Sequence, residues 1–211
     1  MDIKDLRFNY KKDRINFNSL EKNPIVLFLD WFNEAIKLKE YEANACVLST
    51  VNNHNVPSSR VVLLKGVSDV GFIFFTNYTS IKADDISKNS NVALNFFWPY
   101  FERQIRIQGV ASKLSDQDSK EYFSSRPRKS QIGAWVSKQS DTISLDHDFS
   151  IDIERIEKRF FDKEVRKPSE WGGYCVIPNR IEFWQGRPSR LHDRLLYTKE
   201  DENWIINRLS P

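Results

Sequence analysis

The sequence predicts a mainly β protein with helices (α+β), built as one β-barrel domain. Short β-prone segments recur at close spacing over residues 45–114 and again over residues 173–208. Helical segments lie between and around them, and the chain contains no internal repeat, low-complexity tract or linker. Many short strands with intervening helices are typical of a barrel decorated by helices.

The first half of the chain predicts an arm, a helix and five strands. Residues 1–22 are polar and mixed in charge, which predicts a loose arm or one that closes over an anionic ligand. Asn23 and Pro24 begin a helix as N-cap and first helical residue, and apolar residues three and four apart continue it to Ile36. A short helix capped by Ser80 is expected over 80–89. Strands are expected at 45–51, 58–67, 70–76, 92–98 and 103–114.

The second half predicts three helices and four strands. Ser115 begins a helix that runs to about Ser125, where Arg126 and Pro127 break it. Two further helices are expected over 131–136 and 151–161. Strands are expected at 173–177, 180–185, 191–197 and 204–208. With no boundary in composition, residues 23–211 are expected to form a single domain.

Composition fits a soluble globular protein with a sizeable core. The chain has 211 residues, of which 40% are hydrophobic and 29% charged, and a net charge of +3. Surface scaling gives about 10,200 Å² for the folded chain, so about 70% of the unfolded surface is buried. The longest apolar run, residues 25–29, is too short to span a bilayer. We expect a cytoplasmic protein with no membrane partner and no nucleic-acid partner.

Residue types exclude several kinds of site. Only seven glycines are present, and neither G-x-G-x-x-G nor a complete G-x-x-x-x-G-K-[ST] occurs. Any bound phosphate must therefore be held by side chains. Cys46 and Cys175 are expected to be buried apolar residues rather than a disulfide framework. Three histidines without H-E-x-x-H or C-x-x-C predict no metal site.

Two segments in the first half carry groups suited to anions. Arg60 and Lys65 stand at the ends of one apolar strand, about 16 Å apart and on opposite faces, so they cannot bind one phosphate together. They are solvated strand ends, or they hold different ends of a long ligand. Thr76 ends the next strand, and Lys82 lies in the first turn of the following helix. A hydroxyl, a helix N-terminus and a lysine suit a phosphate, although the pattern is weak.

Two further patterns leave alternatives open. Gln104, Arg106 and Gln108 alternate along a strand and share one face, which is solvated or presents a glutamine to a heteroaromatic ring. Tyr122 and Arg126 share a helix face, with Arg128 and Ser130 just beyond the helix end. These groups form either a basic surface turn or a phosphate cup made of side chains.

Residues 183–194 are the densest stretch of reactive side chains. Arg190, His192 and Arg194 lie at i, i+2 and i+4, so a strand would point all three the same way. Three potential cations on one strand face repel one another unless an anionic or electron-rich ligand meets them. This stretch is the part of the sequence that a purely structural role explains least well.

Taken in order, these segments resemble the pyridoxine (pyridoxamine) 5′-phosphate oxidases. Residues 125–140 (SRPRKSQIGAWVSKQS), residues 183–194 and the terminal RLSP are close to family signatures, and the resemblance covers about residues 6–211. It implies an FMN-binding split β-barrel of Greek-key type. It also implies a homodimer, with FMN at the subunit interface and C-terminal dimerisation strands. The implied reaction is oxidation of pyridoxine 5′-phosphate or pyridoxamine 5′-phosphate by oxygen to pyridoxal 5′-phosphate, with release of hydrogen peroxide.

By motif position, the resemblance also implies residue roles. FMN would be contacted by Arg60, Val61, Val62, Leu63, Leu64, Lys65, Phe75, Thr76, Lys82, Gln104, Gln139, Ser140, Trp184 and Arg194. Substrate would be contacted by Arg7, Tyr10, Lys65, Tyr122, Arg126, Ser130, Arg190 and His192, the last two as the catalytic residues beside the flavin. Arg7 and Tyr10 would belong to an arm that covers the site, and Gln139 and Ser140 would serve the neighbouring subunit's cofactor. Ile81 departs from the pattern, because the family often has Arg there.

Two other classes fit parts of the sequence. A different FMN-binding split barrel, such as a flavin reductase or a haem-degrading relative, would lack the phosphate cup at Tyr122, Arg126 and Ser130. A non-enzymatic nucleic-acid-binding barrel would use basic and aromatic side chains. Its excess of Lys and Arg should, however, be larger than three. A flavin spectrum would exclude the nucleic-acid-binding barrel. A substrate assay would distinguish a different FMN-binding split barrel from a pyridoxine (pyridoxamine) 5′-phosphate oxidase.

Overall fold

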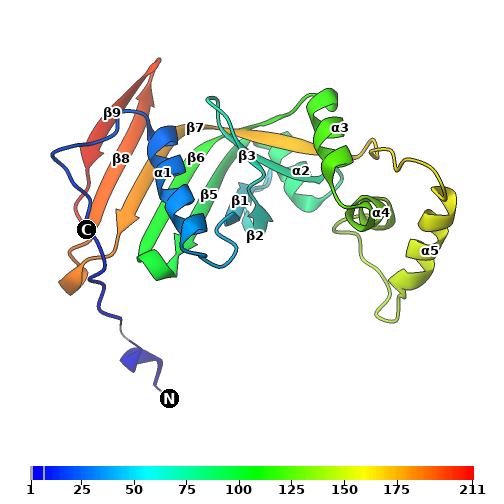
Figure 1. Ribbon diagram of the computed structural model, residues 1–211, viewed down its shortest axis with the longest axis horizontal. Helices are drawn as coiled ribbons and strands as arrows, with labels where there is room; N and C mark the ends of the chain where they lie inside the picture. Colours follow the sequence, from blue (N-terminus) through cyan, green and yellow to red (C-terminus); the bar gives the residue numbers. More distant parts are fainter. Residues whose placement is uncertain (1, 7) are drawn as a thin grey trace.

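A computed structural model describes residues 2–6 and 8–211 as a curled, nine-stranded antiparallel sheet surrounded by helices (Figure 1). The strand order is β2-β1-β5-β6-β7-β4-β3, and the β8–β9 hairpin pairs with the second half of β7. The predicted mainly β architecture with helices is therefore confirmed. The strands are β1 (Ala45–Val51), β2 (Pro57–Leu63), β3 (Gly66–Val67), β4 (Phe72–Asn77), β5 (Asn91–Trp98), β6 (Arg103–Lys113), β7 (Trp171–Gln185), β8 (Asp193–Glu200) and β9 (Asn203–Arg208).

Strand β7 is one continuous element of 15 residues, where two strands were expected. Its first half pairs with β4 and its second half with β8, while β6 runs along nearly its whole length. The register with β6 shifts between Gln108 and Gly109, opposite Pro178. A proline cannot donate to the ladder, so pairing slips at this bulge and then resumes. The long strand thereby joins the barrel to the C-terminal hairpin.

The helices begin close to the predicted residues because their caps are local. Asn23 Oδ1 accepts a hydrogen bond from Ile25 N (2.9 Å), and Ser115 Oγ accepts one from Asp118 N (3.0 Å). Ser80 precedes α2 but donates its hydroxyl to the Asn77 carbonyl instead (2.7 Å). The helices are α1 (Pro24–Lys37), α2 (Ile81–Lys88), α3 (Asp116–Ser125), α4 (Arg128–Val136) and α5 (Phe149–Arg159), with 3-10 turns at Ile3–Asp5, Pro99–Phe101 and Pro188–Arg190.

Two apolar clusters hold these elements together. The larger fills the barrel beneath α1, where the Phe28 ring packs edge-on against Phe72 and Phe96 (centroids 4.8 and 5.2 Å apart). Phe28 is fully buried, so its replacement by Ala would cost about 3–5 kcal/mol. The smaller cluster joins α3, α4 and α5 around Phe123 and Trp171. Cys46 and Cys175 are buried, unpaired thiols, as expected.

The two clusters lie along an elongated molecule. Helices α3–α5 form one end and the β8–β9 hairpin the other (Figure 1). The accessible surface is 13647 Å², about one third above the roughly 10,200 Å² expected for a compact monomer of this mass. None of the described helices is long and apolar enough to cross a membrane.

Candidate active site

A cavity of about 970 Å³ lies among β2, the end of β4, the start of α2, and helices α3 and α4. Side chains from all these elements line it, and Trp171 at the start of β7 closes one side. The predicted site residues that the structure brings together here are Arg60, Val61, Val62, Leu63, Lys65, Phe75, Thr76, Lys82, Tyr122, Arg126, Ser130, Gln139 and Ser140. Leu64 is different, because its side chain is buried in the barrel core.

One part of the cavity gathers two cations with hydrogen-bonding groups. Lys82 is only 7% exposed and donates from Nζ to Ser80 Oγ (3.1 Å). Burial and the positive charge of Arg60 lower the pKa of Lys82 to about 8. An isolated ammonium is costly in such a place unless an anion joins it. The chemistry of this group therefore fits a phosphate.

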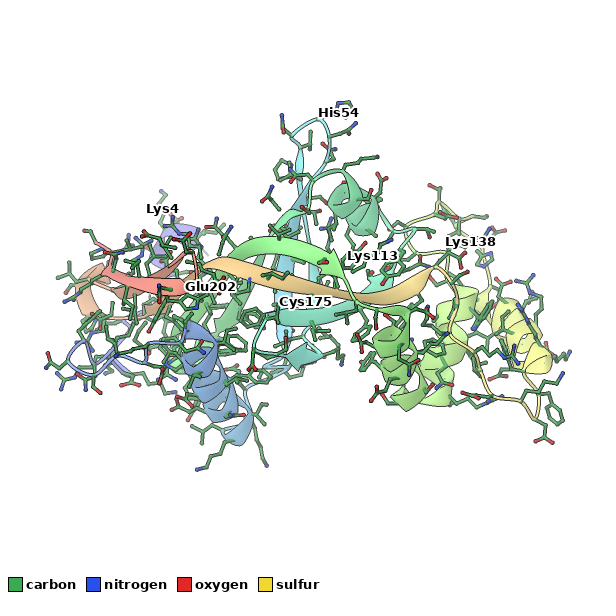
Figure 2. The ribbon with its side chains drawn as sticks, turned by 90° about the horizontal axis from the view of Figure 1, so that it is seen from above. Lys4, His54, Lys113, Lys138, Cys175 and Glu202 are labelled. Carbon is green, nitrogen blue, oxygen red and sulfur yellow. The ribbon has the colours of Figure 1, made fainter. Side chains whose placement is uncertain are left out.

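Gln139 and Ser140 belong to this same group, in their own chain. Gln139 Oε1 accepts from Thr76 Oγ1 (3.0 Å), and Ser140 Oγ accepts from the backbone N of Ile81 (3.3 Å). Both residues therefore lie beside Thr76 and Ile81 of their own chain, whereas the sequence led us to expect them at the neighbouring subunit's cofactor. After α4 the chain folds back over the start of α2, and the spacing of residues in the sequence does not reveal this return. Figure 2 places Lys138, the residue before Gln139, at the end of the molecule that holds α3–α5.

A second cationic group lies around the break between α3 and α4. The Arg126 guanidinium lies 4.7 Å from the centre of the Trp171 ring, and Tyr122 stacks on Phe75 (centroids 3.9 Å apart). Arg126 Nη1 is buried and finds no hydrogen-bond partner within residues 2–6 and 8–211. Burial also lowers the pKa of Arg126. A buried donor without an acceptor is unfavourable by about 1–3 kcal/mol, so this atom fits a ligand oxygen.

Arg128, expected beside Arg126, points elsewhere. Its Nη1 donates to the Lys163 carbonyl (3.0 Å) and its Nη2 to the Phe160 carbonyl (2.7 Å). These two bonds fasten α4 to the end of α5. Arg128 therefore has a structural role, and it is not among the residues that line the cavity.

The remaining predicted residues gather at the other end of β7. Gln104, Trp184 and Arg194 are direct partners on β6, β7 and β8, so they form one row on one face of the sheet. Arg194 Nε donates to the buried carboxylate of Glu182 (2.8 Å), and this bond raises the pKa of Arg194. Arg106 also donates to Glu182 (3.1 Å). The row is thus anchored by a buried carboxylate.

His192 and Tyr10 pack beside this row. The His192 ring lies 4.6 Å from the Trp184 ring and 5.8 Å from the Tyr10 ring, centroid to centroid. The backbone N of Arg187 donates to His192 Nδ1 (3.1 Å), so the neutral ring carries its proton at Nε2. Burial and the nearby charge of Arg190 lower the pKa of His192. The imidazole is therefore predominantly neutral at pH 7.

The prediction that one strand carries Arg190, His192 and Arg194 on one face is wrong at the start of that strand. Strand β8 begins at Asp193, and Pro188–Arg190 is a short 3-10 turn in which Ser189 and Arg190 have φ of 56° and 62°. Arg190 and His192 thus precede the strand, and no single strand face presents all three residues. Pro188 was the available signal, because proline favours turns and cannot join a ladder.

The N-terminal arm reaches the group that contains Trp184 and His192. The backbone N atoms of Lys11 and Lys12 both donate to Glu102 Oε2 (2.8 and 2.9 Å). Beside them the Tyr10 ring packs over Gly186, where an added Cβ would meet Tyr10 Cγ at 2.7 Å. Arg7, the other predicted arm residue, lies outside the described residues.

The two groups of predicted residues are far apart in one chain. Trp171 lines the cavity, whereas Trp184 lies thirteen residues further along β7, a distance of about 40 Å at 3.3 Å per residue. The Trp171 wall of the cavity and Trp184 are therefore well separated within one protomer.

Three contributing residues carried no signal in the sequence. Trp171 forms a wall of the cavity, Glu182 anchors Arg194, and Glu102 holds the arm. A lone Trp or Glu in a strand or turn is usually structural. Only the tertiary arrangement reveals what each of them contacts.

Comparisons with known proteins agree with this geometry. The family model described as pyridoxamine 5′-phosphate oxidase matches residues 32–160. A second model, the pyridoxine 5′-phosphate oxidase C-terminal dimerisation region, matches residues 171–211. A pyridoxine/pyridoxamine 5′-phosphate oxidase 2 from Hydrogenovibrio crunogenus is 51% identical over 211 residues, covering 100% of this chain and 99% of that protein. The Leptospira biflexa pyridoxine/pyridoxamine 5′-phosphate oxidase is 48% identical, with the same coverage.

Solved structures share the fold. PhzG from Burkholderia lata 383, in complex with tetrahydrophenazine-1-carboxylic acid, superposes with a TM-score of 0.89 at 24% identity, covering 95% of this chain and 100% of that one. An FMN-binding protein from Nostoc punctiforme, related to pyridoxamine 5′-phosphate oxidase, gives a TM-score of 0.73 at 16% identity, with 92% and 99% covered. The fold is thus the split barrel. Together with the full-length sequence matches, this establishes that the chain belongs to the pyridoxine/pyridoxamine 5′-phosphate oxidase family.

Proposed function

We propose that the protein oxidises pyridoxine 5′-phosphate or pyridoxamine 5′-phosphate to pyridoxal 5′-phosphate, with oxygen reduced to hydrogen peroxide. FMN is the cofactor that membership of this family assigns to the chain. One observation carries the proposal: a single cavity contains two separate cationic groups and no glycine-rich loop. A reaction with one phosphate on the cofactor and another on the substrate requires two such groups.

The group around Lys82 would hold the FMN phosphate. Arg60 and Lys82 supply charge, while Thr76, Gln139 and Ser140 supply hydrogen-bonding atoms. The lowered pKa of Lys82 supports this assignment, because a phosphate would compensate the cost of its burial.

The group around Arg126 would hold the substrate phosphate. The unpartnered Nη1 of Arg126 supplies a donor, and Tyr122 and Ser130, which line the same cavity, would add their hydroxyls. Lys65 also lines the cavity and adds a second positive charge. Guanidinium, hydroxyl and ammonium groups in one pocket are suited to a phosphate monoester.

A partner subunit would complete the site. The exposed apolar side chains Val61, Leu63 and Phe97 share the sheet face that carries Gln104 and Trp184. The excess accessible surface and the match to a dimerisation region support covering this face in a homodimer. A two-fold axis would place the partner's copy of the row with Trp184 over the cavity, and would do so twice per dimer.

When bound, FMN supplies the redox chemistry, accepting a hydride equivalent from the substrate and passing two electrons to oxygen. The alcohol substrate loses two hydrogens to become the aldehyde, and oxygen gains them as hydrogen peroxide. The amine substrate additionally consumes water and releases ammonia. The protein's side chains bind and orient: Arg126 fixes the phosphate end, and His192 presents the Nε2–H donor to the reacting end. Arg190 would add positive charge there, and Tyr10 of the arm of residues 1–22 would exclude water.

A peroxide assay tests the proposal. Protein loaded with FMN should release peroxide with pyridoxine 5′-phosphate, with pyridoxamine 5′-phosphate, or with both. Unphosphorylated pyridoxine is the matched control and should require a much higher concentration, because it lacks the group that Arg126 binds. Absence of peroxide from both phosphates, or nicotinamide-dependent flavin reduction in their place, would contradict the proposed function.

A further inference from the structure

Behind the wall of the cavity lies a buried polar chain that the proposed function does not yet use. Asp85 on α2 is 3% exposed and Thr50 on β1 is fully buried. Thr50 Oγ1 donates to Asp85 Oδ2 (2.6 Å), and Arg60 Nη1 donates to Thr50 Oγ1 (2.6 Å). Arg60 Nη2 also lies 3.8 Å from Asp85 Oδ2. Arg60 alone among these three residues lines the cavity.

The direction of the hydrogen bonds in this chain is fixed. An ionised carboxylate only accepts, so the Thr50 hydroxyl must give its proton to Asp85. The Thr50 oxygen then has only lone pairs left for Arg60. Arg60 also donates to Leu48 O (3.5 Å) and to Ser58 Oγ (2.7 Å). These contacts use about three of the five guanidinium N–H groups and leave two for a ligand.

A long, flexible side chain is thereby held in one place. A free arginine loses rotamer entropy when a ligand immobilises it. Here β1, β2 and α2 have already fixed the guanidinium before any ligand arrives. Fixed donors bind an anion more tightly than mobile ones, because the ordering cost is already met in folding.

We propose that Asp85 and Thr50 are positioning residues that hold Arg60 against the phosphate of FMN. This inference rests on the proposed function, which places that phosphate beside Arg60 and Lys82. Neither residue would touch the cofactor itself. Their action passes through the guanidinium.

The direction of the change in FMN affinity distinguishes a positioning role from a simple electrostatic effect. A carboxylate beside the phosphate site makes the local potential less positive, so its removal would by itself tighten phosphate binding. Positioning requires the reverse, because loss of Asp85 or Thr50 frees the Arg60 side chain. Thr50→Val is the cleaner change, since it breaks both hydrogen bonds without altering any charge.

The test titrates apoprotein with FMN and with riboflavin, which lacks the phosphate, by quenching of flavin fluorescence. Thr50→Val and Asp85→Asn should each raise the Kd for FMN about tenfold and leave the Kd for riboflavin within twofold of wild type. Thr50→Ser keeps the hydroxyl and should retain the wild-type affinity. Asp84→Asn is the matched control, because Asp84 lies on the same helix but is exposed and pairs with Lys88.

Each outcome decides a separate question. Equal weakening of FMN and riboflavin, or unchanged or tighter FMN binding in Thr50→Val, overturns the positioning role. If Asp85→Asn fails to fold, the Thr50→Val and Thr50→Ser pair still decides. If wild-type apoprotein does not prefer FMN over riboflavin, the phosphate site itself, and with it the proposed function, is wrong.

Discussion

Arg126→Ala should raise the KM for phosphorylated substrates and leave kcat nearly unchanged. The phosphate is remote from the reacting carbon and does not change during the reaction. Its contact with Arg126 is therefore about equally strong in the ground and transition states. Losing a charged hydrogen bond costs about 1.5–3 kcal/mol, which corresponds to an increase in KM of about 10- to 150-fold.

The structure also predicts the effect of this change on stability. Arg126 Nη1 has no hydrogen-bond partner in the described chain, so Arg126→Ala breaks no side-chain hydrogen bond of that atom. It does remove the guanidinium from the Trp171 ring, 4.7 Å away, which is worth about 0.5–2 kcal/mol. Removing an unpaired buried cation would, by contrast, raise the free energy of unfolding. The melting temperature should therefore change by only a few degrees.

Arg128→Ala is the matched control. Arg128 lies two residues away and donates to the Lys163 and Phe160 carbonyls rather than lining the cavity. It should lower the melting temperature without changing KM. The assay is steady-state peroxide release over a range of substrate concentrations, with FMN occupancy checked by absorbance. A fall in kcat at constant KM for Arg126→Ala would refute the anchoring role, as would an equal effect on unphosphorylated pyridoxine.

Three further predictions follow from the site. Because Lys82 has a pKa of about 8 before the phosphate binds, FMN affinity should fall by up to about tenfold per pH unit above pH 8. The profile should be flat in Lys82→Met, and a flat wild-type profile in the same titration would contradict the assignment. Gly186→Ala should displace Tyr10, because an added Cβ would meet Tyr10 Cγ at 2.7 Å, and it should raise KM and expose the arm to trypsin; unchanged KM and unchanged cleavage would contradict the packing of Tyr10 over Gly186. Ile81→Arg adds a cation at the cavity wall and should lower the Kd for FMN by up to about tenfold; unchanged affinity would mean that other groups already satisfy the phosphate.

The sequence predicted the elements whose signals are local. Strand β1 matches its expected range, because residues 45–51 are a β-prone run that ends at the turn of residues 52–55. The N-caps at Asn23 and Ser115 were recognisable because the hydroxyl or amide acts within three residues. The predicted start of β8 was wrong. The turn at Pro188 and the positive φ of Ser189 prevent an extended strand there, although Arg190, His192 and Arg194 alternate in the sequence.

Features that depend on segments far apart in the sequence could not be predicted in this way. Gln139 reaches Thr76 across 63 positions, and nothing near Gln139 reveals on which subunit it acts. Asp85 resembles an ordinary helical carboxylate, and only the packing of α2 against β1 buries it beside Thr50. The predicted site residues form two groups because β7 is one long strand with a group near each end, whereas the sequence predicted two short strands.

Complementation between two impaired variants, assayed at a substrate concentration near the wild-type KM, tests the shared site most directly. Arg126→Ala alters the cavity, and His192→Ala alters the group that the partner would bring to it. In a heterodimer carrying one of each, one site holds both changes and the other holds neither. Co-expressed and purified with two different tags, this heterodimer should regain about half the wild-type activity per dimer, because one of its two sites is intact. If each site were built from a single chain, neither site would be intact, and at this substrate concentration the heterodimer would stay as impaired as its parents.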